Sequence, residues 1–68
     1  MNEEVHNMSV RKFLKKVGVT SQREIEEAVR AAVSSGRLKG NEVLPAKVKL
    51  TVSGIDLSVE IEGSVDLE

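Results

Sequence analysis

The stretch VGVTSQREIEEAVRAAV, residues 17–33, decides how the first half of this chain folds. Gly18 is followed by Val19 and Thr20, and a short turn containing glycine is typical of the link between two helices. Ser21-Gln22-Arg23-Glu24 then has the spacing of a capping box, in which a hydroxyl and a carboxylate satisfy free backbone N–H groups at a helix N-terminus. The sequence therefore predicts that one helix ends at Gly18 and that a second begins at Ser21.

Apolar residues recur on both sides of this turn at the i, i+3, i+4, i+7 spacing of an amphipathic helix. They are Val10, Phe13, Leu14 and Val17 before the turn, and Ile25, Ala28, Val29, Ala32 and Val33 after it. Gly36 follows the second group and is a typical helix stop. We therefore expect helices over residues 8–17 and 21–35. The first helix has three alternative N-cap residues, Asn2, Asn7 and Ser9.

From Val43 onward the apolar residues recur with a period of 2, which is typical of strands with one buried face. This pattern predicts an antiparallel β-hairpin with strands over residues 46–52 and 55–62 and a two-residue turn at Ser53-Gly54. Val65 and Leu67 indicate a short third strand. The turn would pair Val52 with Ile55, Leu50 with Leu57, Val48 with Val59, and Lys47 with Glu60.

These elements predict an α+β fold in a single domain, residues 1–68, in which the two N-terminal helices pack on the C-terminal hairpin. A domain of this size buries only about 60% of the surface that its unfolded chain exposes. Two helices on a two-stranded sheet make a thin core, which favours a homodimer formed through a sheet edge or through Val5 and Met8. Val5 and Met8 form this candidate interaction surface because a helix that begins near Asn2 projects them away from its apolar stripe. Fraying of the terminal residues is the simpler interpretation of these two positions.

The composition excludes several classes of protein. The chain has no cysteine, which rules out disulfides, thiolate zinc sites and thiol nucleophiles and is consistent with a reducing compartment. Its N-terminus is charged where a signal peptide is apolar, and no run approaches the roughly 20 apolar residues of a membrane span. We therefore expect a soluble, cytoplasmic protein that does not contact membranes.

The turn at Gly18 also raises the question of a DNA-reading helix-turn-helix. In that motif, the residues about six and nine positions after the glycine lie on the buried side of the second helix. In this chain those residues are Glu24 and Glu27. Carboxylates near the N-terminus of a reading helix would also be repelled by phosphates. A plain helical hairpin is therefore favoured over sequence-specific DNA binding.

A basic face on the first helix is the best candidate for binding an anionic partner. Residues 1–40 carry eight Lys and Arg against five Asp and Glu, whereas residues 41–68 carry two against six. The face consists of Arg11, Lys12, Lys15 and Lys16. No aromatic residue accompanies it, since the only one, Phe13, lies on the opposite side, so stacking on bases is not available. A solvated helix face is the simpler interpretation, and nucleic acid stays an alternative partner.

The sequence shows no catalytic, metal or cofactor site. His6 is the only histidine and lacks the companions that a zinc site or a catalytic triad needs. Glu60 and Glu62 alternate with apolar residues on a strand, which places both carboxylates on the outer face and not in a cleft. The segment from Gly36 to Asn41 lacks the flanking strand and helix of a phosphate-binding loop. We therefore expect no enzymatic activity and no cofactor.

These observations favour a non-enzymatic module that binds another protein, of unknown identity, through the sheet edge or the N-terminal helix. The alternative is a nucleic-acid-binding regulator that uses Arg11, Lys12, Lys15 and Lys16.

The string FLKKVGVTSQREIE, residues 13–26, and the segment LKGNE-LPA after it resemble a family of short, uncharacterised, largely proteobacterial proteins of about 65 to 70 residues. The resemblance covers nearly the whole chain. It implies a small bacterial protein of unknown function and gives no functional residues to carry over. Family members often have an aromatic residue near position 6, where this chain has His6, so an aromatic contact at that position is in doubt.

Overall fold

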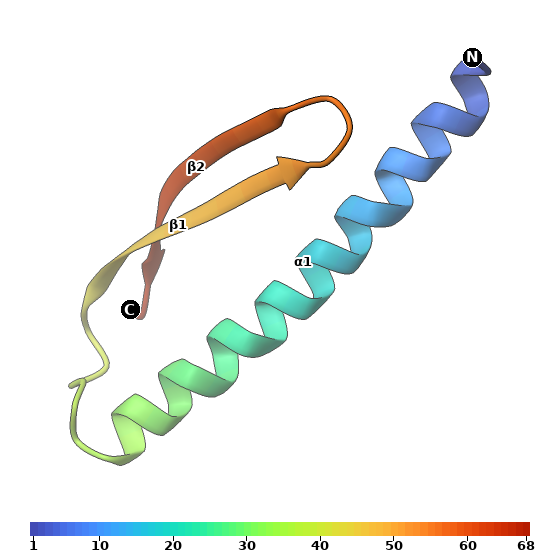
Figure 1. Cartoon of the computed structure of the whole chain (residues 1–68). Helices are drawn as coiled ribbons and strands as arrows, with labels where there is room; N and C mark the ends of the chain where they lie inside the picture. The colour runs from blue at the N-terminus through green and yellow to red at the C-terminus, as the bar shows by residue number, and fades with distance from the viewer. The chain divides into compact units, whose positions relative to one another are not determined.

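The computed structural model describes all residues, 1–68. The chain divides into two compact units, residues 1–37 and 38–68. The first unit contains helix α1 (Glu3–Ser34), and the second contains strands β1 (Val43–Val52) and β2 (Leu57–Asp66) (Figure 1). The predicted α+β class is confirmed.

α1 is one continuous helix of 32 residues, so the prediction of two helices over residues 8–17 and 21–35 was wrong. Gly18 does not have the positive φ of a C-cap glycine. Glycine inside a helix costs about 1 kcal/mol relative to alanine. A break, however, would leave up to four N–H and four C=O groups without helical partners at the two new helix ends. Continuing the helix keeps these groups bonded, and this outweighs the local preference of Gly18 for a turn.

The apolar residues on the two sides of Gly18 also favour a continuous helix. Leu14 and Ile25 are eleven residues apart, which is close to three full turns, so both lie on one side of α1. Ser21 lies between them on the same side and is half-buried. It is an interior residue of the helix and not an N-cap, so the predicted capping box with Glu24 was wrong.

The ends of α1 are capped by the residues around them. Asn2 is the N-cap, and its Oδ1 accepts hydrogen bonds from the backbone N–H groups of Glu4 (3.0 Å) and Val5 (3.1 Å). This settles the choice between Asn2, Asn7 and Ser9. The predicted stop at Gly36 is confirmed, since Gly36 has a φ of +82°. The N–H of Gly36 donates a hydrogen bond to the carbonyl of Val33 (3.1 Å), and the N–H of Arg37 donates one to the carbonyl of Ala32 (2.9 Å). These two bonds form a Schellman motif.

β1 and β2 pair antiparallel as a two-stranded sheet, which confirms the predicted hairpin but corrects its register. A four-residue loop, 53–56, connects the strands, so Val52 lies opposite Leu57 and not Ile55. A two-residue type I′ turn would require positive φ at both central residues, and Ser53 is poorly suited to this. The observed loop gives positive φ to Gly54 (+93°) and Asp56 (+52°) instead. Glycine and aspartate tolerate that conformation better than most residues do.

The remaining predicted pairs shift with the loop. Leu50 lies opposite Val59, Val48 opposite Ile61, and Lys47 opposite Glu62. Lys47 still approaches Glu60, now diagonally, with Nζ 3.6 Å from Oε2. No third strand forms, because Val65 belongs to β2 and lies opposite Leu44. A shift of two residues leaves every side chain on its original face, which explains why the alternation alone could not reveal it.

Candidate interaction surfaces

The apolar stripe of α1 is the longest candidate surface in the chain, and no residue of α1 is buried. On the stripe, Val10, Phe13 and Leu14 keep 43%, 49% and 51% of their surface exposed. Val17 and Val29 are half-buried. We define the stripe by eight apolar residues: Val10, Phe13, Leu14, Val17, Ile25, Ala28, Val29 and Ala32. The sequence pattern identified these residues, but it assigned them to a hydrophobic core, and none of them is buried.

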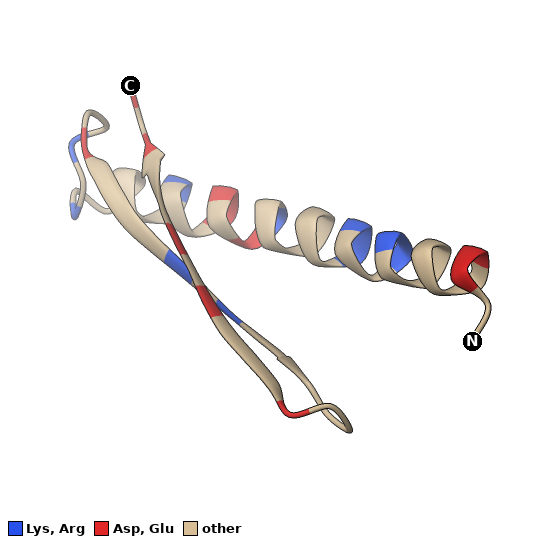
Figure 2. Cartoon of the chain, turned by 90° about the horizontal axis from the view of Figure 1, so that it is seen from above, with Lys and Arg blue, Asp and Glu red and all other residues tan.

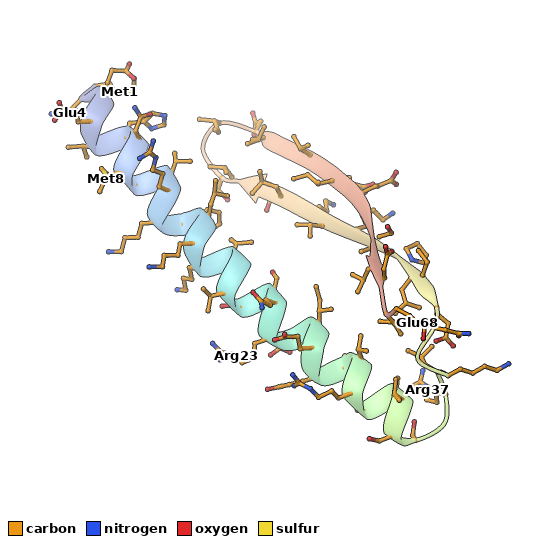
Figure 3. The ribbon with its side chains drawn as sticks, turned by 180° about the vertical axis from the view of Figure 1, so that it is seen from behind. Met1, Glu4, Met8, Arg23, Arg37 and Glu68 are labelled. Atoms are coloured by element: carbon orange, nitrogen blue, oxygen red, sulfur yellow. The ribbon has the colours of Figure 1, made fainter.

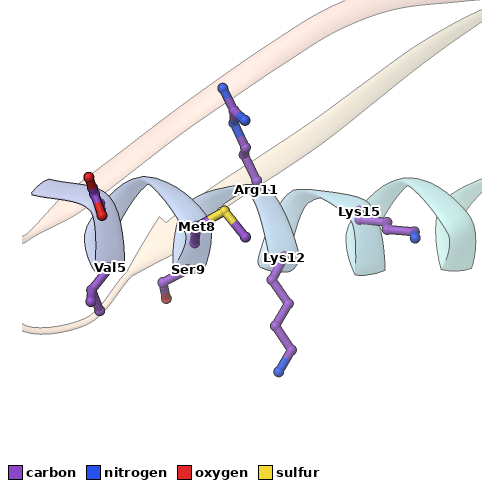
Figure 4. Close-up of a pocket in the computed structure, with 7 residues that line it drawn as sticks. Val5, Met8, Ser9, Arg11, Lys12 and Lys15 are labelled. Carbon is purple, nitrogen blue, oxygen red and sulfur yellow. The ribbon is translucent and has the colours of Figure 1, made fainter.

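Val5 and Met8 lie on the other side of α1, where the side chains form a shallow hollow (Figure 4). Each keeps 65% of its surface exposed. Figure 3 shows Met8 on the same side of the helix as Arg23. The hollow is lined only by residues of α1, among them Lys12 and Lys15. It therefore lies along the surface of one helix.

Arg11, Lys12, Lys15 and Lys16 are all exposed, and Figure 2 shows positive charge along this part of α1. At 100° per residue the four side chains fan over an arc of about 140°. Figure 4 shows this spread, since Arg11 and Lys12 project to opposite sides of the ribbon. The ion pair in the structure joins Lys47 and Glu60, so these four cations are free to meet an external anion.

The segment between α1 and β1 contains a small anion-binding site that the sequence analysis missed. The Glu42 carboxylate accepts hydrogen bonds from the backbone N–H groups of Lys39 (2.8 Å), Gly40 (2.9 Å) and Asn41 (3.2 Å). The bonds from Lys39 and Gly40 are the main reason why the pKa of Glu42 lies below its ordinary value. Successive N–H groups of this kind form a nest that holds anions in many proteins. Here the chain's own carboxylate fills it.

The signal for this nest was present in the sequence as Gly40 and the acid two residues after it. Gly40 has a φ of +105°, which turns neighbouring N–H groups toward one point. A phosphate-binding loop receives its anion from a ligand, whereas this loop supplies its own carboxylate.

The ionisable groups give no arrangement typical of an active site. Glu42 is the group with a clearly shifted pKa, and its backbone partners account for that shift. No group of three or more His, Cys, Asp or Glu side chains is placed to hold a metal ion. His6 is exposed on α1. No stretch of α1 combines the length and apolar character needed to cross a bilayer.

Comparison with known proteins identifies the family. No curated protein and no solved structure matches the chain. A family model does match, and it covers residues 1–68. This confirms the predicted membership of a family of short proteins of unknown function. The chain belongs to DUF6494, described as a family of unknown function.

Proposed function

We propose that this protein is a non-enzymatic interaction module whose protein partner packs on the apolar stripe of α1. The observation that supports the proposal is that a helix of 32 residues contains no buried residue although one side of it is apolar. In proteins, most helix stability comes from packing an apolar side against something else. Fully covering a Val, Leu, Ile or Phe side chain stabilises by about 1.5–3 kcal/mol. About half of that is still available at Val10, Phe13 and Leu14.

The polar groups support a binding role over catalysis. Three backbone N–H groups already occupy the Glu42 carboxylate, so it is poorly placed to transfer protons. The hollow beside Met8 is a surface of one helix. General acid–base chemistry instead needs a carboxyl or imidazole held close to substrate.

The test compares the size of the tagged full-length protein in native cell lysate with that of two variants. Leu14→Asp puts a charge on the stripe, and Met8→Asp puts the same charge on the other side of α1. We expect the wild type and Met8→Asp to elute in complexes larger than the monomer, and Leu14→Asp to elute as the monomer. Elution of the wild type as a monomer would overturn the proposal. Loss of the complex only in Met8→Asp would move the partner to the surface around Val5 and Met8.

A second candidate function rests on the four free cations, Arg11, Lys12, Lys15 and Lys16. If all four contact phosphates of duplex nucleic acid, log K falls with log salt concentration with a slope of about −3.6. Binding to a mixed pool of DNA and RNA should then disappear in Lys12→Glu/Lys15→Glu. The control Arg23→Glu/Arg30→Glu makes the same charge change on the same helix and should bind as the wild type does. Equal binding by both double variants would exclude this function.

A further inference from the structure

The stripe of α1 has an internal symmetry that follows from the continuous helix. Its first four residues lie 11, 8, 7 and 4 positions before Ser21, and its last four lie 4, 7, 8 and 11 positions after it. If two copies of α1 pack in opposite directions with Ser21 beside Ser21, each residue i therefore meets residue 42−i. Each of the eight stripe residues then faces an apolar residue of the other copy: Val10 faces Ala32, Phe13 faces Val29, Leu14 faces Ala28, and Val17 faces Ile25. Val33, which the sequence pattern also places in this apolar group, lies at its edge and would face Ser9.

The sizes of these side chains distinguish the antiparallel arrangement from the parallel one. The half of the stripe before Ser21 is bulky and contains Phe13 and Leu14, whereas the half after it contains Ala28 and Ala32. Antiparallel packing places Leu14 against Ala28 and Phe13 against the smaller Val29, so the bulky residues are shared between both ends of the contact. Val17 and Ile25 are both β-branched and meet near its centre. Parallel packing would place Phe13 near Phe13 and Ala32 near Ala32, so the helices would be forced apart at one end and leave a gap at the other.

Charge favours the same orientation. Lys15 and Lys16 of one copy would lie level with Glu27 and Glu26 of the other. Lys12 would lie level with Arg30, so the match in charge is carried by these two pairs. A parallel pair would bring four cations of each copy to the same level. Lys15, Lys16, Glu26 and Glu27 lie outside the contact and act through solvent, so they select the orientation more than they strengthen binding. Glu24 lies within the arc of the stripe and would be level with Gly18, which has no side chain.

We propose that the partner of the stripe is a second copy of this chain, and that the two α1 helices form an antiparallel pair with a two-fold axis at Ser21. The inference rests on the proposed function, because it assigns a partner to the same stripe. When two apolar stripes pack in this way, the axes of the two helices lie about 8–10 Å apart. Ser21 is half-buried in the single chain, and its small side chain allows close approach at the axis.

Cysteine cross-linking tests the arrangement directly, because the chain has no cysteine of its own. Ser21→Cys should oxidise to a disulfide-linked dimer. The control Val19→Cys lies on the far side of α1 and should react at least about tenfold more slowly, since the effective concentration inside a dimer reaches the millimolar range. Val10→Cys alone should not link to itself, because its two copies would be about 33 Å apart along the axis. Mixed with Ala32→Cys, it should give the mixed disulfide.

Self-linking of Val10→Cys at the rate of Ser21→Cys would show a parallel pair and overturn the inference. Equal rates for Ser21→Cys and Val19→Cys would overturn it as well. Circular dichroism of each reduced variant checks that α1 is still helical.

Sedimentation equilibrium of the untagged wild type separates this inference from the proposed function. We expect a dimer at about 100 μM, well above a micromolar Kd, and a monomer for Leu14→Asp. A purified wild type that is monomeric, but that elutes in a larger complex from native lysate, would reject the second copy and keep the interaction function. A wild type that is monomeric in both experiments would reject both.

Discussion

Replacing Gly18 by alanine tests whether α1 is continuous. A continuous helix and a helix that ends at Gly18 predict changes in stability of opposite sign. In a continuous α1, alanine removes the entropic cost of an interior glycine and should stabilise by about 0.8–1.0 kcal/mol. An added Cβ at Gly18 meets no atom within 4 Å, so no steric cost opposes this gain. If Gly18 instead ended a first helix in the left-handed conformation, alanine would destabilise by about 1–2 kcal/mol.

The assay is thermal unfolding followed by circular dichroism at 222 nm, with the protein concentration held fixed because association raises Tm. For a domain of this size the gain corresponds to an increase in Tm of roughly 3–8 °C. Gly36→Ala is the matched control, because Gly36 has a φ of +82° and also has free space around it. It should lower Tm. A fall for Gly18→Ala comparable to that of Gly36→Ala would refute the continuous helix.

Three further predictions concern the cap, the nest and the hairpin. Asn2→Ala should destabilise the protein by about 1 kcal/mol, because the side chain that accepts hydrogen bonds from two backbone N–H groups is lost. Ser9→Ala, in the helix interior, should not destabilise it. Thermal unfolding of both variants checks this prediction. Glu42→Gln should destabilise at neutral pH, because the nest favours the charged carboxylate. Because the pKa of Glu42 is lowered in the folded state, this stabilisation is fully present above pH 4.5, the ordinary pKa of glutamate. It is lost as the pH falls through the pKa of the folded state. Wild type and variant should therefore converge at low pH in unfolding curves, and a difference that grows on acidification would contradict the role of the nest. Glu60→Gln should change stability by less than about 0.5 kcal/mol, because an exposed ion pair is worth little; the side chains of Lys47 and Glu60 are 56% and 55% exposed. A double-mutant cycle with Lys47→Met measures the coupling, and a value above about 1 kcal/mol would show that the pair is more strongly shielded than its exposure indicates.

The sequence predicted those elements whose signals are local and are not opposed by other interactions. Alternating apolar residues located both strands, and Gly36 marked the end of α1. The prediction of a helix end at Gly18 was wrong because the preference of glycine for a turn over a helix is worth only about 1 kcal/mol. The backbone hydrogen bonds of a continuous helix, and an apolar stripe that stays in phase from Val10 to Ala32, outweigh it. The sequence shows this phase only when the apolar residues on the two sides of Gly18 are considered together.

The candidate surfaces were predictable to a similar degree. The positions of Val5 and Met8 away from the stripe followed once the helix began at Asn2, and the exposure of the four cations followed from their spacing. Gly40 and the acid two residues after it are a weak signal for the nest at Glu42, because residue types do not fix the backbone conformation. The nest depends on the φ of Gly40, which aims three N–H groups at one carboxylate.

The hairpin loop has a consequence for how this family can vary. Because a shift of two residues keeps every strand residue on its face, the strands by themselves allow more than one alignment. The left-handed residues Gly54 and Asp56 therefore carry the information that selects one alignment, and they leave Ile55 in the loop with 69% of its surface exposed. Exchanges among Val, Ile and Leu within β1 and β2 should therefore leave the alignment unchanged. A change of one residue in the length of the loop would turn one strand over, so insertions there should be tolerated only in pairs.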